Sequence, residues 1–311
     1  MGDFLNVSFI SALLCGGILT GMPLLFASTG ETISQRAGVL GMGLEGIMLV
    51  GAYFGFAITL YTGQFWLGLF ASIVAGVLTS GIVALLCVRL GMDQIVVGIG
   101  VLIFGEGVTS VLQRAQFGTT YPRLGEMAIV KIPILSSIPV LGSSLFSQPL
   151  IVYIGFILVG VLQWVLKSTN LGLNFRAAGG KPEALDASGT SVIYTRFLAV
   201  LIAGGLAGLG GGYMSIVGAG IFVPFMTKGV GFIAIVIAML ARGKAIWVLI
   251  GSFLFGISVS LTTSLQLVGV EVAQDFVNMI PFVAVLTALI IFARGDYLPA
   301  ALCLPYNREA R

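Results

Sequence analysis

Long apolar stretches, separated by short polar ones, dominate the sequence. Eight of them have about the length that a helix needs to cross the hydrocarbon core of a membrane. A ninth, Phe232–Leu240, is too short to span alone, so we expect it to be tilted or half-buried among other helices. The eight full-length stretches are Phe4–Phe26, Gly38–Tyr61, Phe65–Val88, Ile95–Leu112, Leu150–Leu166, Arg196–Val217, Ala245–Leu267 and Met279–Ala293.

The composition agrees with a membrane protein. Of the 311 residues, 58% are hydrophobic and 9% charged, with a mean hydropathy of +1.11, whereas soluble domains carry about 25% charged residues. The amino-terminal region has Asp3 and no basic residue, which favours a retained first helix over a cleaved signal peptide. We therefore predict an all-α, polytopic transmembrane bundle of eight to ten spans, forming a single transmembrane domain over residues 1–311.

Basic residues set the expected orientation, since short cytoplasmic loops are enriched in Lys and Arg. With nine crossings, the segment 167–195 is cytoplasmic. The amino terminus, the connection 113–148 and the loop with Glu271 and Asp275 are then outside. The connection 113–148 is too interrupted by proline to span the membrane. The basic residues that this arrangement puts on the cytoplasmic side are Arg36, Arg89, Lys167, Arg176, Lys181, Arg196, Arg242, Lys244, Arg294, Arg308 and Arg311.

Two carboxylates, Glu45 and Glu106, interrupt apolar stretches. A charge near the membrane centre costs about 2.5 to 3.5 kcal/mol, so such a side chain faces protein or a water-filled cavity. Glu45 is surrounded by glycines that allow neighbouring helices to approach closely. Two interpretations remain open: a structural residue that is hydrogen-bonded inside the bundle, or a residue that lines a solute path.

Several classes of chemistry are disfavoured. The chain has no histidine, and its cysteines, Cys15, Cys87 and Cys303, are far apart, so neither a metal site nor a disulfide framework is indicated. No Gly-x-Ser-x-Gly motif is present, which argues against an intramembrane enzyme, and we predict no catalytic residue in this chain. The net charge of +3 does not point to nucleic acid, and membrane lipid is the expected surrounding.

The polar segment between Leu171 and Gly189 predicts one short helix of about two turns. Pro182 suits its first turn, Glu183 and Asp186 suit its positive end, and Gly189 suits its carboxyl-terminal stop. Glycine-rich arms flank it. So short a helix is unstable alone, which favours a docking surface on another subunit, although an ordinary solvated loop is the alternative. The glycines between Gly204 and Gly212 predict a close-packed sixth span.

Three stretches together resemble the permease subunits of ATP-binding-cassette (ABC) importers, in the branch for nucleosides and simple sugars that is related to the ribose and branched-chain amino-acid permeases. Arg36 to Ala52 is similar to that branch's Glu-containing motif and departs from it at Gly41-Met42, where the family has Asn-Ile. Phe175 to Gly189 resembles the coupling loop. Gly205 to Tyr213, with Thr227 to Ala234 and Val248 to Gly251, is the third match.

The resemblance implies an importer half in the bacterial cytoplasmic (inner) membrane. Its expected partners are an ABC ATPase, a second homologous permease forming a heterodimer, and an extracytoplasmic solute-binding protein. Because the chain lacks a Walker A motif, we expect ATP to be bound by the partner and no cofactor by this chain. The residues expected to couple to the ATPase are Arg176, Pro182, Glu183, Ala184, Asp186 and Gly189.

Alternating access is the mechanism that the resemblance implies, with a nucleoside or simple sugar as solute. A sugar needs hydroxyl partners, and a base needs an aromatic face. A proton- or sodium-coupled transporter or channel using Glu45 and Glu106 is the alternative, although it leaves the segment 172–189 without a purpose. The candidate residues of the translocation path are Glu45, Glu106, Tyr53, Phe54, Phe104 and Phe232.

Overall fold

The computed structural model describes residues 7–131, 141–267 and 298–306, with the single residues 279, 283, 286, 287 and 290. The helices are α1 Val7–Arg36, α2 Leu44–Thr62, α3 Phe65–Val83, α4 Gln94–Phe117, α5 Leu141–Leu145, α6 Leu150–Ser168, α7 Asn170–Gly180, α8 Pro182–Ala187, α9 Val192–Tyr213, α10 Val230–Leu240 and α11 Ala245–Leu267. Single π-helical turns, Ala84–Arg89 and Met214–Gly218, extend α3 and α9. Strands β1, Ile129–Lys131, and β2, Ser147–Pro149, pair antiparallel.

The polytopic all-α architecture is confirmed. Among the described residues, six helices are long and apolar enough to cross a membrane: α1, α2, α3 with its π-helical turn, α4, α6, and α9 with its π-helical turn. Helix α10 and the stretch Ala245–Leu261 of α11 are apolar but shorter. The expected span Met279–Ala293 falls almost wholly outside the described residues, as does the loop with Glu271 and Asp275.

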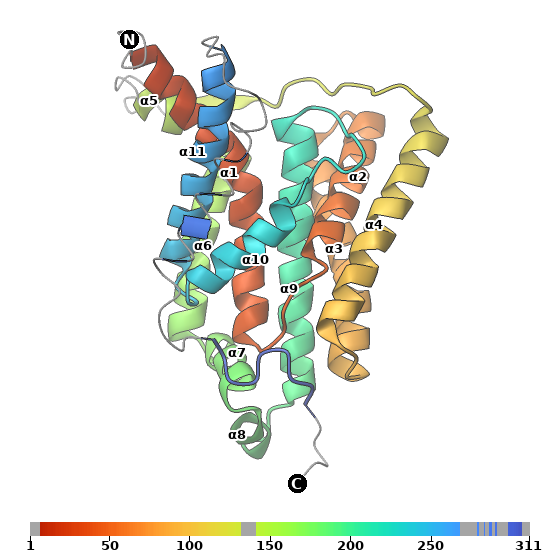
Figure 1. The fold of residues 1–311 in the computed structure, drawn as a ribbon, viewed down its shortest axis with the longest axis vertical. Helices are drawn as coiled ribbons and strands as arrows, with labels where there is room; N and C mark the ends of the chain where they lie inside the picture. The colour runs from red at the N-terminus through yellow and green to blue at the C-terminus, as the bar shows by residue number, and fades with distance from the viewer. Residues whose placement is uncertain are drawn as a thin grey trace.

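The two ends of the bundle differ in what they carry (Figure 1). Helices α7 and α8 and residues 298–306 lie at one end, here called the inner end, and the start of α1 and helix α5 lie at the other, the outer end. The Arg36 guanidinium at the end of α1 donates a hydrogen bond to the carbonyl of Arg242. The turn between α10 and α11 therefore lies at the inner end with other basic residues, as the charge pattern predicts.

Helix α1 is longer than predicted. The first span was expected to end at Phe26, but the helix includes Pro23 and continues to Arg36. The polar residues that follow this expected end, from Ser28 to Gln35, are buried in the bundle. Some of their polar groups bond locally, as when Thr32 donates to the carbonyl of Ser28 at 2.7 Å, whereas the hydroxyls of Ser28 and Thr29 are buried without a hydrogen-bond partner among the described residues.

Non-helical backbone separates α1 from α2. The second span was expected from Gly38, but α2 begins at Leu44, and residues 37–43 cross part of the bundle as an irregular segment. A Cβ on Gly43 would lie 3.2 Å from Val101, which is the eighth residue of α4, so α2 begins well inside the bundle. Irregular backbone is tolerated at membrane depth only where protein or a water-filled cavity surrounds it, and residues 37–43 are largely buried.

Helix α9 occupies the centre of the bundle, between α1, α2 and α3 (Figure 1). A Cβ on Gly51 of α2 would lie 2.5 Å from the Cα of Gly208, and one on Gly208 would lie 2.2 Å from the carbonyl oxygen of Ser72 in α3. No larger residue fits at these crossings. The predicted close packing of this glycine-rich span is confirmed, although the helix starts at Val192 rather than Arg196.

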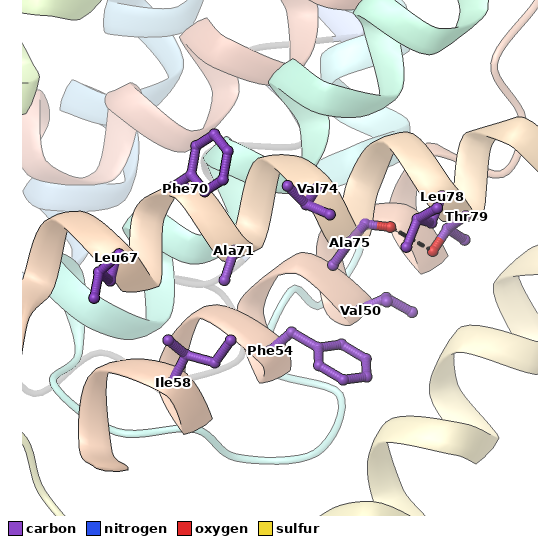
Figure 2. A pocket seen from close by; sticks show the side chains of 10 residues that line it. All are labelled: Val50, Phe54, Ile58, Leu67, Phe70, Ala71, Val74, Ala75, Leu78 and Thr79. Atoms are coloured by element: carbon purple, nitrogen blue, oxygen red, sulfur yellow. Dashed lines mark hydrogen bonds between the residues drawn. The ribbon is translucent and has the colours of Figure 1, made fainter. Parts of the chain in front are cut away.

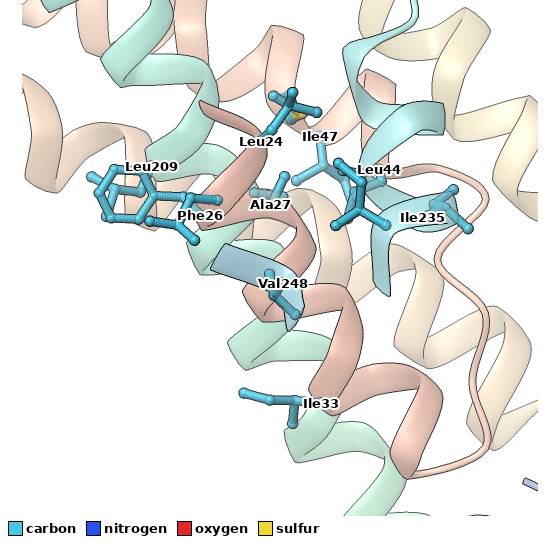
Figure 3. Close-up of a cluster of buried hydrophobic side chains, with 14 of the residues drawn as sticks. Leu24, Phe26, Ala27, Ile33, Leu44, Ile47, Leu209, Ile235 and Val248 are labelled. Carbon is cyan, nitrogen blue, oxygen red and sulfur yellow. The ribbon is translucent and has the colours of Figure 1, made fainter. Parts of the chain in front are cut away.

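Helix α10 connects the middle of the bundle to its inner end. Its 11 residues extend about 16 Å, roughly half of the hydrocarbon thickness. Most of its residues are buried by other helices. The expectation that this segment is half-buried among other helices is therefore correct. The apolar core joins α10 to the spanning helices, as Figure 3 shows for Leu44, Ile235 and Val248 around α1.

Substitution of Gly208 tests the close crossing. We expect Gly208→Val to lower the thermal stability of the detergent-purified chain, because overpacking costs about 1–3 kcal/mol and the obstructing atoms are backbone. Gly107→Val on α4 is the matched control, since a Cβ there meets nothing within 4 Å. Unfolding temperatures measured by fluorescence-detected size-exclusion chromatography check the prediction, and equal temperatures for the two variants would contradict it.

Candidate functional site

Glu45 lies in the first turn of α2 and holds the start of α10. Its side chain is 4% exposed, and its carboxylate accepts hydrogen bonds from the N–H groups of Gly229 (2.8 Å) and Gly231 (2.6 Å). Helix α10 has no side-chain cap of its own at Gly229. A carboxylate at a helix amino terminus satisfies N–H groups that have no partner in the helix and interacts favourably with the helix dipole. Glu45 therefore ties α2 to α10.

The two glycines make this contact possible. Gly229 has a φ of +87°, a left-handed conformation that glycine adopts without strain. A Cβ on Gly231 would lie 2.6 Å from the Cα of Glu45. The backbone of α10 can thus approach α2 closely enough for the carboxylate to reach both donors, the N–H groups of Gly229 and Gly231.

Tyr53 is buried between three segments. It is 2% exposed, and its hydroxyl donates to the amide oxygen of Gln116 in α4. Its ring meets Phe222 edge-on at a centroid distance of 5.2 Å and Phe54 at 5.5 Å. Tyr53 thereby joins the outer halves of α2 and α4 to the connection that follows α9.

Phe54 lies in an apolar groove between α2 and α3 (Figure 2). The groove has a volume of about 430 Å³ and includes Val50, Phe70 and Val74. Thr79 is its one residue with a polar side chain, and the Thr79 hydroxyl donates to the carbonyl of Ala75. The groove therefore offers a sugar no side-chain donor that is not already engaged.

Phe104 and Glu106 lie on opposite flanks of α4. Two positions along an α-helix correspond to a rotation of about 200°, and the face between them, with Val101 and Gly105, packs on α2. Phe104 is 52% exposed and Glu106 is partly buried. Phe232 on α10 is 37% exposed. Of the six predicted path residues, the groove of Figure 2 includes Phe54 alone.

A second buried carboxylate, Glu31, was not among the predicted site residues. Its side chain is fully buried in α1 and accepts hydrogen bonds from the side-chain amide of Gln35 (2.9 Å) and the N–H of Gly41 (3.0 Å). Gln94 of α4 accepts from the N–H of Leu40 at 2.9 Å. The spacing of Glu31 and Gln35, four residues apart and hence on one helix face, was the signal available in the sequence.

Glu31 and Glu45 thus share a structural task. Each satisfies backbone N–H groups where a helix is interrupted inside the bundle, Glu31 in the segment 37–43 and Glu45 at the start of α10. Buried backbone donors without partners are costly. This geometry accounts for two carboxylates in an apolar environment without assigning either to an ion or a solute.

The short helix predicted after Pro182 is present, with one difference in its surroundings. Helix α8 begins at Pro182 and ends at Ala187, within the bounds that proline, acidic residues and glycine predicted. Its amino-terminal arm, however, is not a loop but a second helix, α7. Thr169 caps α7 by accepting from the N–H of Gly172 at 3.2 Å.

Helix α8 presents a defined surface at the inner end. Pro182 and Leu185 are buried, whereas Glu183 and Ala184 are exposed and Asp186 is partly buried. Gly189 ends the segment with a φ of +86°. Arg176 on α7 is exposed, and its guanidinium donates to the carbonyl of Gly172. Five of the six predicted coupling residues therefore lie on α7 and α8, and Gly189 follows α8.

Comparison with known families identifies the chain. A family model described as the branched-chain amino acid transport system / permease component matches residues 13–293. The chain belongs to this permease family. The permease is thus a multi-pass protein of the inner membrane, as the apolar helices indicate. Permease subunits of ABC transporters are in general non-catalytic components that act with an ATPase and a solute-binding protein.

Three relatives are similar over almost their whole length. One from Haloferax volcanii, provisionally named glucose ABC transporter permease protein TsgC13, is 33% identical, covering 97% of the permease and 99% of the relative. The nucleoside ABC transporter permease protein NupC of Lactococcus lactis is 30% identical over 95% and 96%. The guanosine ABC transporter permease protein NupQ of Bacillus subtilis is 30% identical over 98% and 99%.

Each of these organisms also has a second, differently named ABC transporter permease protein that is similar to less of the permease. No solved structure matched the chain.

Proposed function

We propose that this permease is the membrane-spanning subunit of an ATP-driven importer that moves a nucleoside or a simple sugar by alternating access. The observation that carries the proposal is similarity over the full chain to permease proteins named for nucleoside, guanosine and glucose. The exposed surface of α8 at the inner end supports a docked ATPase, which would bind ATP, with no cofactor in this chain.

A heterodimer with a sister permease is the proposed assembly. Three organisms each contain two different relatives of this permease, which supports a pair of unlike chains. Phe54, Phe104 and Phe232 are each more than a third exposed, and with the partly buried Glu106 they would contribute to a path that the second permease completes. An extracytoplasmic binding protein would deliver the solute at the outer end.

Glu45 and Tyr53 act differently in this proposal. Both are buried and hydrogen-bonded within the permease, so they shape the path by positioning α10 and the outer half of α4. The ion-coupled alternative, with Glu45 as a proton or sodium site, is less well supported because two backbone N–H groups already occupy its carboxylate.

Solute uptake by right-side-out membrane vesicles tests the function. Vesicles containing the permease, its sister chain, the ATPase and the binding protein are supplied with labelled guanosine or glucose, with and without lumenal ATP. We expect uptake of one solute that requires ATP and persists when an ionophore collapses ion gradients. Uptake that is independent of ATP and lost with the ionophore would overturn the importer and favour the ion-coupled class.

A further inference from the structure

Arg196, near the start of α9, is buried and faces backbone carbonyls. Its side chain is 3% exposed. One terminal nitrogen of the guanidinium donates to the carbonyl of Leu304 at 2.7 Å. The other donates to the carbonyls of Ala178 at 3.0 Å and Ala301 at 3.4 Å. Three partners from two distant segments therefore converge on one side chain of α9.

The position of Arg196 indicates that its charge stabilises α7 rather than α9. A cation near the amino terminus of α9 is at the unfavourable end of that helix dipole, whereas the same cation lies at the favourable, carboxyl-terminal end of α7. Burial of a charge costs several kcal/mol unless hydrogen bonds compensate. The contacts that offset this cost are those to α7 and to residues 298–306.

The end of α7 depends on these contacts. The last four carbonyls of a helix have no partner within it. In α7, the carbonyl of Ala177 accepts from the N–H of Lys181 at 2.9 Å, that of Ala178 accepts from Arg196, and that of Gly179 accepts from the N–H of Ala301 at 2.9 Å. The segment 298–306 and α9 therefore complete the carboxyl-terminal end of α7.

The same segment also holds the connection from α1 to α2. The N–H of Cys303 donates to the carbonyl of Gly38 at 3.1 Å. Gly38 has a φ of +91°, and a Cβ on Gly179 would lie 2.3 Å from the carbonyl oxygen of Arg36. We name Gly38, Gly179, Arg196, Ala301 and Cys303 the base node. It joins α7, α9 and residues 298–306 to the start of the irregular segment 37–43.

From the base node, the chain leads directly to the inner half of the bundle. Residues 40 and 41 bond to Gln94 and Glu31, and α2 then begins with Glu45, which holds α10. On the other side of the node, Leu185 of α8 is buried in one apolar cluster with Ala178 of α7 and Val192 of α9. Contacts thus run without a gap from α8 to the start of α10.

We propose that Arg196 is a positioning residue that makes the base node rigid, so that a displacement of α7 and α8 is transmitted to residues 37–43 and on to α2 and α10. The inference rests on the proposed function, in which an ATPase moves α8. Residues 298–306 act in it as a strap that carries force between α7 and the α1–α2 connection. Packed elements linked in this way switch between discrete arrangements rather than deforming continuously.

Two variants loosen the base node by different routes. Arg196→Lys keeps the charge but replaces the planar fork with a single nitrogen, which cannot serve carbonyls on both sides. Ala301→Pro removes the N–H that donates to Gly179 and leaves Arg196 unchanged. Ala300→Pro is the matched control at the neighbouring exposed position, outside the node.

The test measures ATP hydrolysis and solute uptake in the reconstituted complex of permease, sister chain, ATPase and binding protein. We expect the uptake per ATP hydrolysed to fall about 10-fold, within the range of mutations that modulate coupling, in both Arg196→Lys and Ala301→Pro. Co-purification of the ATPase and the rate of hydrolysis should be retained. Ala300→Pro should keep the wild-type ratio.

Two outcomes would overturn the proposal. Wild-type uptake per ATP in Ala301→Pro would exclude a relay through the base node, and this variant decides the matter if Arg196→Lys does not fold. A loss of uptake and hydrolysis in proportion to the amount of assembled complex would show a merely structural role. Failure of the ATPase to co-purify with the unaltered permease would instead overturn the proposed function, which distinguishes the two.

Discussion

Replacement of Glu45 with alanine is expected to abolish uptake and to lower the thermal stability of the purified permease. The substitution leaves the N–H groups of Gly229 and Gly231 buried without an acceptor, and each such group costs about 1–3 kcal/mol. It also removes the negative charge at the start of α10. Glu45→Gln should be intermediate, because the amide keeps one acceptor oxygen for two donors.

Glu106→Gln is the control for this experiment. Glu106 is the other carboxylate predicted to line the path, and it is partly exposed on a flank of α4. We expect its neutral variant to unfold at the wild-type temperature and any change to appear in solute affinity alone. Fluorescence-detected size-exclusion chromatography after heating measures stability, and vesicle uptake measures transport. A Glu45→Ala permease as stable as the wild type would refute the capping role.

Reversal of the charge on α8 should disconnect the permease from ATP hydrolysis. Arginine at positions 183, 184 and 186 replaces Glu183, Ala184 and Asp186 on or beside the exposed face, while Pro182 and Leu185, which are buried, stay in place. A helix of six residues is unstable by itself, so its exposed face suits a partner surface. We expect normal membrane insertion and at least about a 10-fold loss of ATP-dependent uptake.

Glu126→Arg provides the control for charge reversal. Glu126 is exposed in the connection that follows α4, and this connection runs along the outer end of the bundle, away from α8 (Figure 1). This variant should retain ATPase co-purification and uptake. The amount of ATPase recovered with affinity-purified permease separates the two, and undiminished recovery and uptake for the α8 variant would remove the coupling assignment.

Helix α7 illustrates how packing can override a local signal. Its glycines at 172, 179 and 180 favoured an irregular arm, since a glycine inside a helix costs about 1 kcal/mol relative to alanine. Yet a Cβ on Gly172 would lie 2.2 Å from the carbonyl oxygen of Val165 in α6, and Gly179 contacts the α1–α2 connection. The glycines permit a sharp corner and a close contact, which no local pattern reveals.

The sequence alone determined the membrane class and most of the spans, through the length of its apolar stretches, and the short helix at Pro182, through its terminal residues, because bilayer thickness and helix-terminal preferences act on neighbouring residues. It also located Glu45 as an anomaly. Only the tertiary structure decided what Glu45, Glu31 and Arg196 do, because each bonds to backbone that is remote in the sequence. A charged residue in an apolar stretch indicates that a hydrogen-bonding partner exists. When that partner is a backbone group, no residue type in the sequence marks its position, so only the fold identifies the partner.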